Sequence, residues 1–173
     1  SDHDEVEVRQ RRSVHLSVNP IMVGDVQVNL LDTPGYADVV GAMRAGLRGA
    51  DAALFVISAL DGVDGRTRML WEECAAVGMP RAVAVTRIDH PRADFDAVVA
   101  RCQEAFGPGV HPAYVPATRG SGDHRTLVGL WGLVSERYHD YSGGEGPVSA
   151  PDWLREQAGP LRETLIEEVI TES

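Results

Sequence analysis

The 173-residue sequence contains no lysine, and its sixteen basic residues are all arginine. This absence excludes every mechanism that needs an ammonium side chain, including Schiff-base catalysis and the phosphate-binding loop GxxxxGK[ST]. Twenty-six Asp and Glu residues outnumber the arginines and give a net charge of −10. Because such a chain repels a phosphate backbone on average, we expect it to bind no nucleic acid directly.

Cysteine and long apolar runs are scarce as well. The two cysteines, Cys74 and Cys102, each fall within an apolar helical pattern, which predicts buried free thiols rather than a disulfide or a metal pair. The longest apolar run, residues 52–60, is far shorter than the roughly 20 residues that span a membrane. No apolar leader opens the sequence, so we expect a cytoplasmic protein that has no membrane partner.

Strand and helix patterns alternate between residues 14 and 117. Apolar residues alternate on both sides of a turn at Gly24-Asp25, which predicts a β-hairpin. Apolar strands over residues 52–58, 81–86 and 111–117 then alternate with helical patterns, one of them capped by Asp94. The alternation predicts an α/β fold with a doubly wound, mostly parallel sheet, to which the hairpin adds an antiparallel partner. A final helix is predicted from about Pro160.

Two short motifs lie beyond the carboxyl ends of strands, where doubly wound sheets bind ligands. DTPG at residues 32–35 follows a buried strand. It is typical of a simple turn. Alternatively, its Asp holds Mg²⁺ through water and its Gly amide donates to a terminal phosphate oxygen. TRID at residues 86–89 ends a later strand. Its carboxylate is either a helix-start or ion-pairing group, or the acceptor of two N–H groups from a guanine edge.

Together these motifs, about fifty residues apart, resemble those of translational GTPases, above all the GTPase domain of elongation factor G and its paralogues. The run NLLDTPGYADVVGAMRAGLRGADAALFVISALDGVDGRTRMLWEECAAVGMPRAVAVTRID covers the positions of the family's DxxG and [NT]KxD motifs at the family spacing, with TRID at the second. The resemblance extends from about Arg9 to the C-terminus. It implies an incomplete sheet of the P-loop GTPase type. We expect the chain to have three parts: a mobile arm and first-switch remnant (1–13), a partial GTPase core (14–117), and an elongation-factor-G-type insert subdomain with a C-terminal helix (118–173).

The resemblance also implies that a full-length parent protein binds GTP or GDP with Mg²⁺. Five positions match the family's nucleotide-binding motifs: Asp32, Gly35, Thr86, Arg87 and Asp89. Mg²⁺ is assigned to Ser13 and Asp32, and Tyr36 occupies the catalytic place of the histidine that orients the attacking water. Because a phenol with a pKa of about 10 stays neutral where a histidine can carry charge, we expect slow hydrolysis.

Two further departures from the family pattern bear on activity. Thr86 and Arg87 replace the Asn and Lys of the guanine motif. The arginine stem still stacks along a base, but threonine lacks the amide that bonds the ring edge. The family's phosphate-binding loop lies upstream of the residues matched here, so we expect this chain to be a fragment that is inactive alone.

The sequence therefore predicts the GTP-binding domain of an elongation-factor-G-like protein, which meets the ribosome through its parent. Two alternatives stay open: a ribosomal-protection-type GTPase, and a degenerate module that binds a nucleotide or the ribosome without hydrolysis. An intact GxxxxGK[ST] upstream favours an enzyme, and its loss favours the module.

Overall fold

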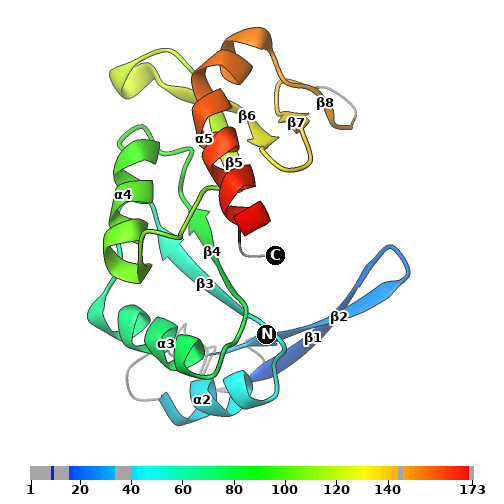
Figure 1. The fold of residues 1–173 in the computed structure, drawn as a ribbon, viewed down its shortest axis with the longest axis vertical. Helices are drawn as coiled ribbons and strands as arrows, with labels where there is room; N and C mark the ends of the chain where they lie inside the picture. The colour runs from blue at the N-terminus through cyan, green and yellow to red at the C-terminus, as the bar shows by residue number, and fades with distance from the viewer. Residues whose placement is uncertain (1–8, 10–15, 34–39, 144–145, 172–173) are drawn as a thin grey trace. The chain divides into compact units, whose positions relative to one another are not determined.

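The computed structural model describes residue 9 and residues 16–33, 40–143 and 146–171 (Figure 1). The backbone forms two compact units, Ser1–Phe55 with Met69–Ala82 and Val56–Arg68 with Val83–Ser173. No helix within the described ranges is long and apolar enough to cross a lipid bilayer.

The first unit opens with the predicted hairpin. Strand β1 (Ser17–Val23) pairs antiparallel with β2 (Val26–Asp32), and Val23 lies opposite Val26 across the turn. Gly24 takes a left-handed φ of 59°, which a two-residue hairpin turn of this hand requires. The predicted hairpin is therefore confirmed.

Helix α2 (Val40–Arg48) and helix α3 (Gly65–Ala76) follow. The Arg44 guanidinium donates to both carboxylate oxygens of Glu73, with N–O distances of 3.0 and 2.5 Å. This forked ion pair raises the pKa of Arg44 and lowers the pKa of Glu73. It joins α2 to the part of α3 that belongs to the same unit.

Strands β3 (Ala53–Ser58) and β4 (Arg81–Thr86) pair with each other. The Ala53 amide donates to the Pro80 carbonyl and the Ala59 amide to the Thr86 carbonyl, each at 2.9 Å. Because both partners advance together along the chain, the pair is parallel. The parallel sheet that the sequence predicts is therefore present, as a pair of strands.

Helix α4 (Phe95–Phe106) packs beside this pair in the second unit. The Asp94 carboxylate accepts the Ala97 amide at 3.0 Å, which confirms the predicted N-cap. Its apolar face buries Val98 and Cys102 against Ile57 and Ala59 of the β3 end. The sequence therefore places this helix and its buried face correctly.

Both cysteines are free and buried, as the sequence predicts. Cys74 lies on α3 and Cys102 on α4, with exposed fractions of 1% and 4%. Burial raises the pKa of each thiol, because an apolar environment disfavours the thiolate. Neither group is therefore poised for nucleophilic chemistry.

The remaining strands form an antiparallel sheet in the order β5-β6-β7-β8. Its members are β5 (Tyr114–Arg119), β6 (Thr126–Gly132), β7 (Arg137–Asp140) and β8 (Val148–Ser149), with a 3₁₀ turn at Gly122–His124 between the first two. The strand–helix alternation predicts that the β5 segment belongs to the parallel sheet, and that prediction is wrong. Pro116, which lacks an N–H, suits the edge position that β5 occupies.

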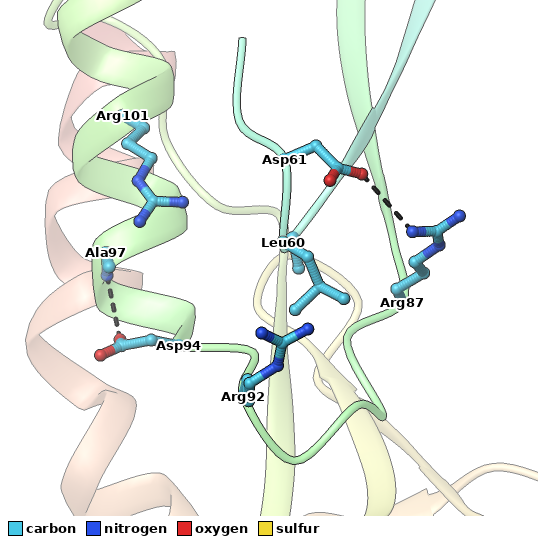
Figure 2. A pocket seen from close by; sticks show the side chains of 8 residues that line it. Leu60, Asp61, Arg87, Arg92, Asp94, Ala97 and Arg101 are labelled. Carbon is cyan, nitrogen blue, oxygen red and sulfur yellow. Dashed lines mark hydrogen bonds and ion pairs between the residues drawn. The ribbon is translucent and has the colours of Figure 1, made fainter.

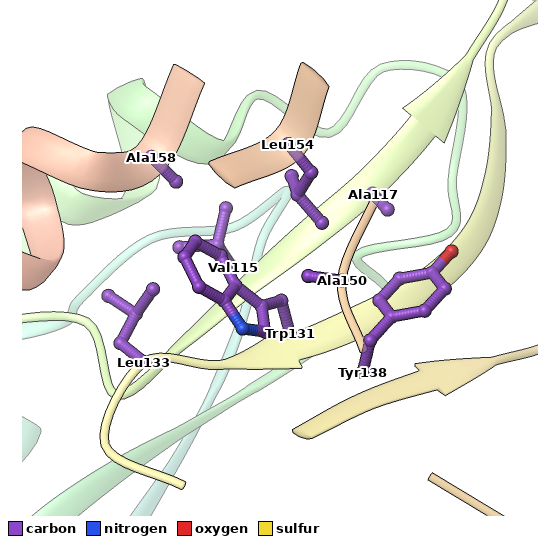
Figure 3. Close-up of a cluster of buried hydrophobic side chains, with 8 residues drawn as sticks. All are labelled: Val115, Ala117, Trp131, Leu133, Tyr138, Ala150, Leu154 and Ala158. Atoms are coloured by element: carbon purple, nitrogen blue, oxygen red, sulfur yellow. The ribbon is translucent and has the colours of Figure 1, made fainter. Parts of the chain in front are cut away.

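Helix α5 (Asp152–Thr171) covers one face of this sheet and completes its core (Figure 3). The buried side chains are Val115, Ala117, Trp131, Leu133, Tyr138, Ala150, Leu154 and Ala158. The helix begins eight residues before Pro160, where the sequence analysis predicts its start. Burial of Leu154 and Ala158, one turn apart, stabilises the first turns of the helix. This stabilisation outweighs the cost of the backbone hydrogen bond that Pro160 cannot donate.

The α/β class with a parallel sheet is thus confirmed, and the sheet is incomplete. Within the described ranges, β1–β2, β3–β4 and β5–β8 are three separate sheets. The division at residues 13 and 117 stays a prediction.

Gly129 in β6 supplies a test of this packing. A Cβ added there would lie 2.5 Å from the His139 carbonyl oxygen and against the Tyr138 ring. That ring is fixed, since its hydroxyl donates to the Val128 carbonyl at 3.3 Å. We expect Gly129→Ala to lower the free energy of unfolding by about 1–3 kcal/mol. The reason is that the His139 backbone cannot move away from the added Cβ as the end of a flexible side chain could.

Urea denaturation followed by tryptophan fluorescence measures this loss. Gly109→Ala is the matched control, because a Cβ at Gly109 meets no described atom within 4 Å. Equal stability of the two variants would contradict the packing described for β6 and β7.

Candidate functional site

The carboxyl ends of β3 and β4 are tied together at one edge. The Thr86 hydroxyl donates to the Ile57 carbonyl at 3.1 Å, beside the backbone bond from Ala59 to Thr86. Its side-chain oxygen therefore bridges the two strands. The loops after both strands start side by side as a result.

Arg87, the first residue after β4, has a φ of 58°. This left-handed conformation is uncommon for a residue with a long side chain and costs roughly 1–2 kcal/mol. Its guanidinium lies 3.5 Å from the Asp61 carboxylate in the loop after β3, and both side chains are well exposed. Such strain concentrates at functional positions, so Arg87 is the strongest local indication of a site.

The turn that follows Arg87 is closed by its own backbone and by a histidine. The His90 amide donates to the Arg87 carbonyl at 3.2 Å, and His90 Nδ1 accepts the Arg92 amide at 3.1 Å. Asp89 lies within this turn and is exposed. The turn therefore presents the Asp89 carboxylate at the surface, two residues from Arg87.

A cavity of about 370 Å³ lies between the loop after β3 and α4 (Figure 2). Three small or apolar residues and five charged ones line it: Ala59, Leu60, Asp61, Arg87, Arg92, Asp94, Ala97 and Arg101. Arg87 belongs to this lining, whereas Thr86 and Asp89 do not. The cavity therefore adjoins the TRID motif on one side.

The structure brings together only some of the predicted site residues. Thr86, Arg87 and Asp89 share one strand end, while Asp32 ends β2 in the other unit and is exposed. Gly35, Tyr36 and Ser13 lie outside the described residues. No group of three or more His, Cys, Asp or Glu residues in the described part of the chain could hold a metal ion.

Three charged residues of the cavity, Asp61, Arg92 and Arg101, were not predicted from the sequence. Asp61 follows β3 at the same edge as Thr86, so its place in a strand-end loop was a usable signal. Arg92 and Arg101 carry no comparable signal, because their approach to the β3 loop depends on how α4 packs. These two arginines therefore needed the structure.

Comparison with known proteins identifies the family. The family model of the elongation factor Tu GTP binding domain matches residues 1–171. The chain belongs to this GTP-binding domain family. An elongation factor G-like protein of Mycobacterium tuberculosis is 48% identical over 177 residues, in strain CDC 1551 and in strain H37Rv alike. This match covers 99% of the chain and 24% of the relative.

Two more distant relatives agree with this assignment. Elongation factor G of Mycoplasma pneumoniae is 30% identical over 148 residues, covering 82% of this GTP-binding domain and 21% of that protein. A crystal structure from Thermus thermophilus matches with a TM-score of 0.86 and 31% identity, over 99% of this chain and 25% of the other. The resemblance and the fold class are thus confirmed. The domain spans about a quarter of the length of these relatives.

The backbone strain at Arg87 can be measured directly. Arg87→Gly removes the left-handed penalty that Arg87→Ala retains. We therefore expect the glycine variant to be more stable than the alanine variant by about 1 kcal/mol, although glycine gains freedom in the unfolded chain.

Urea denaturation of both variants gives this difference. Glu136 offers a matched control, since its φ is 55° in a turn remote in sequence from the motif. Glu136→Gly should likewise have a larger free energy of unfolding than Glu136→Ala. If alanine at position 87 were as stable as glycine, Arg87 would not be strained.

Proposed function

We propose that the parent of this domain binds GTP and GDP at the carboxyl ends of β3 and β4. The observation that carries this proposal is Arg87, held in a left-handed conformation directly after β4 and two residues before the exposed Asp89. A strained arginine and a carboxylate on one short turn suit a flat base with N–H donors. Membership of a GTP-binding domain family supports the same ligand.

Asp89 is the residue to which we assign guanine selectivity. An ionised carboxylate accepts two hydrogen bonds, which matches the ring N–H and the amino group of guanine. The Arg87 stem would stack along the base plane. Thr86, the remaining residue assigned to nucleotide binding in this motif, would also hold the strand ends in place, because its hydroxyl donates to the Ile57 carbonyl.

The phosphates and Mg²⁺ are assigned to other residues. Asp32 would hold Mg²⁺ through water, with the Ser13 hydroxyl as a second ligand, and the Gly35 amide would bond a terminal phosphate oxygen. The exposed Asp32 carboxylate at the end of β2 suits this arrangement. Bound Mg²⁺ would neutralise charge on the phosphates. Since the sequence contains no GxxxxGK[ST], we assign the main phosphate contacts to a part of the parent outside these residues.

We further propose that the parent is a cytoplasmic translation GTPase that acts on the ribosome. Tyr36 would orient the attacking water as a neutral hydrogen-bonding group, so that hydrolysis is slow. The names of the relatives, an elongation factor G and elongation factor G-like proteins, support a role in translation.

A binding module without hydrolysis is the second candidate. Replacement of the water-orienting histidine by Tyr36 favours it. A ribosomal-protection-type GTPase is a further variant of the first candidate.

Base selectivity tests the proposal in the full-length parent. Asp89→Asn exchanges an acceptor of two N–H groups for one acceptor and one donor. We expect GTP to bind about 30-fold more weakly, a loss of about 2 kcal/mol, and xanthosine triphosphate to bind more tightly, because xanthine carries an oxygen where guanine carries the amino group.

Competition binding with both nucleotides measures this exchange. Asp94→Asn is the matched control: Asp94 lies five residues away, and asparagine caps a helix as well as aspartate does. If Asp89→Asn changed the affinities for GTP and for xanthosine triphosphate in the same direction and by the same factor, Asp89 would not face the base.

A further inference from the structure

Four arginines gather beside α4 in a chain whose net charge is −10. Arg87, Arg92 and Arg101 line the cavity of about 370 Å³. A second cavity, of about 290 Å³, shares Asp61 and Arg101 with the first and is lined also by Arg68. We call these two adjoining cavities the arginine groove. The local charge of the groove is thus unlike that of the chain as a whole.

The carboxylates of the groove are partly engaged elsewhere. Asp61 faces Arg87 at 3.5 Å, and Asp94 accepts the Ala97 amide at the start of α4. Glu104 lines the second cavity on the Arg68 side. The groove thus carries four arginines against three carboxylates, and Asp61 and Asp94 have partners other than Arg92 and Arg101.

No ion pair within the described ranges involves Arg68, Arg92 or Arg101. Figure 2 shows the guanidinium groups of Arg92 and Arg101 turned toward the space between α4 and the loop after β3. Two converging guanidinium groups that form no ion pair with a described residue repel each other, so this arrangement favours an added anion.

We propose that the arginine groove binds the phosphate group of a small phosphorylated ligand. Guanidinium groups bind phosphate oxygens in pairs. Ala59, Leu60 and Ala97 form an uncharged wall against which the carbon part of a ligand would pack. Asp89 does not line the groove, whereas Arg87 does, so this site adjoins the proposed guanine site and shares Arg87 with it.

Pyrophosphate is the probe, because it offers phosphate oxygens and no base. Calorimetry on this 173-residue chain at constant ionic strength should show millimolar binding or tighter. Arg92→Gln and Arg101→Gln should each weaken binding at least about fivefold, whereas Arg92→Lys, which keeps the charge but loses the fork, should weaken it less. Arg137→Gln on β7 is the matched control, since Arg137 is exposed and lines neither cavity.

Three results would overturn the proposal. The first is no binding at about 10 mM pyrophosphate. The second is an equal loss of affinity in Arg137→Gln. The third is a short RNA hairpin that binds through the same arginines more tightly than pyrophosphate does. Circular dichroism of each variant verifies the fold. Since pyrophosphate carries no guanine, failure here leaves the nucleotide proposal standing, and failure of the Asp89 test leaves this one.

Discussion

The parallel pairing of β3 with β4 is the constraint on which the proposed site depends. Backbone bonds at Ala53 and Ala59 fix the register, and the Thr86 hydroxyl adds a bond to Ile57 at the carboxyl end. Because the two strands end level with each other, Asp61 and Arg87 come within reach although 26 residues separate them. Every charged group of the cavity is then placed relative to this edge or to α4, which packs beside it.

Local patterns were sufficient for the elements whose structure is decided locally. Gly24 and Asp94 are residue types that favour a tight turn and a helix cap, so the hairpin and α4 could be predicted. The partner of β5 and the start of α5 could not, because both depend on burial against residues distant in sequence. Leu154, almost fully buried, stabilises turns of α5 that precede Pro160.

The site shows the same division between local and tertiary information. Thr86, Arg87 and Asp89 are recognisable because a short motif follows an apolar strand. The strain at Arg87 and the strand-bridging bond of Thr86 are invisible in the sequence, since residue types do not reveal φ angles or hydrogen-bond partners. Arg92 and Arg101 join the cavity only through the packing of α4.

The most direct test of the central claim is a crystal structure of the full-length parent with GDP bound. We expect the guanine edge to lie about 2.7–3.1 Å from the Asp89 carboxylate oxygens, with the Arg87 side chain along the face of the base. A base bound away from the end of β4, with Asp89 turned to solvent, would contradict the account.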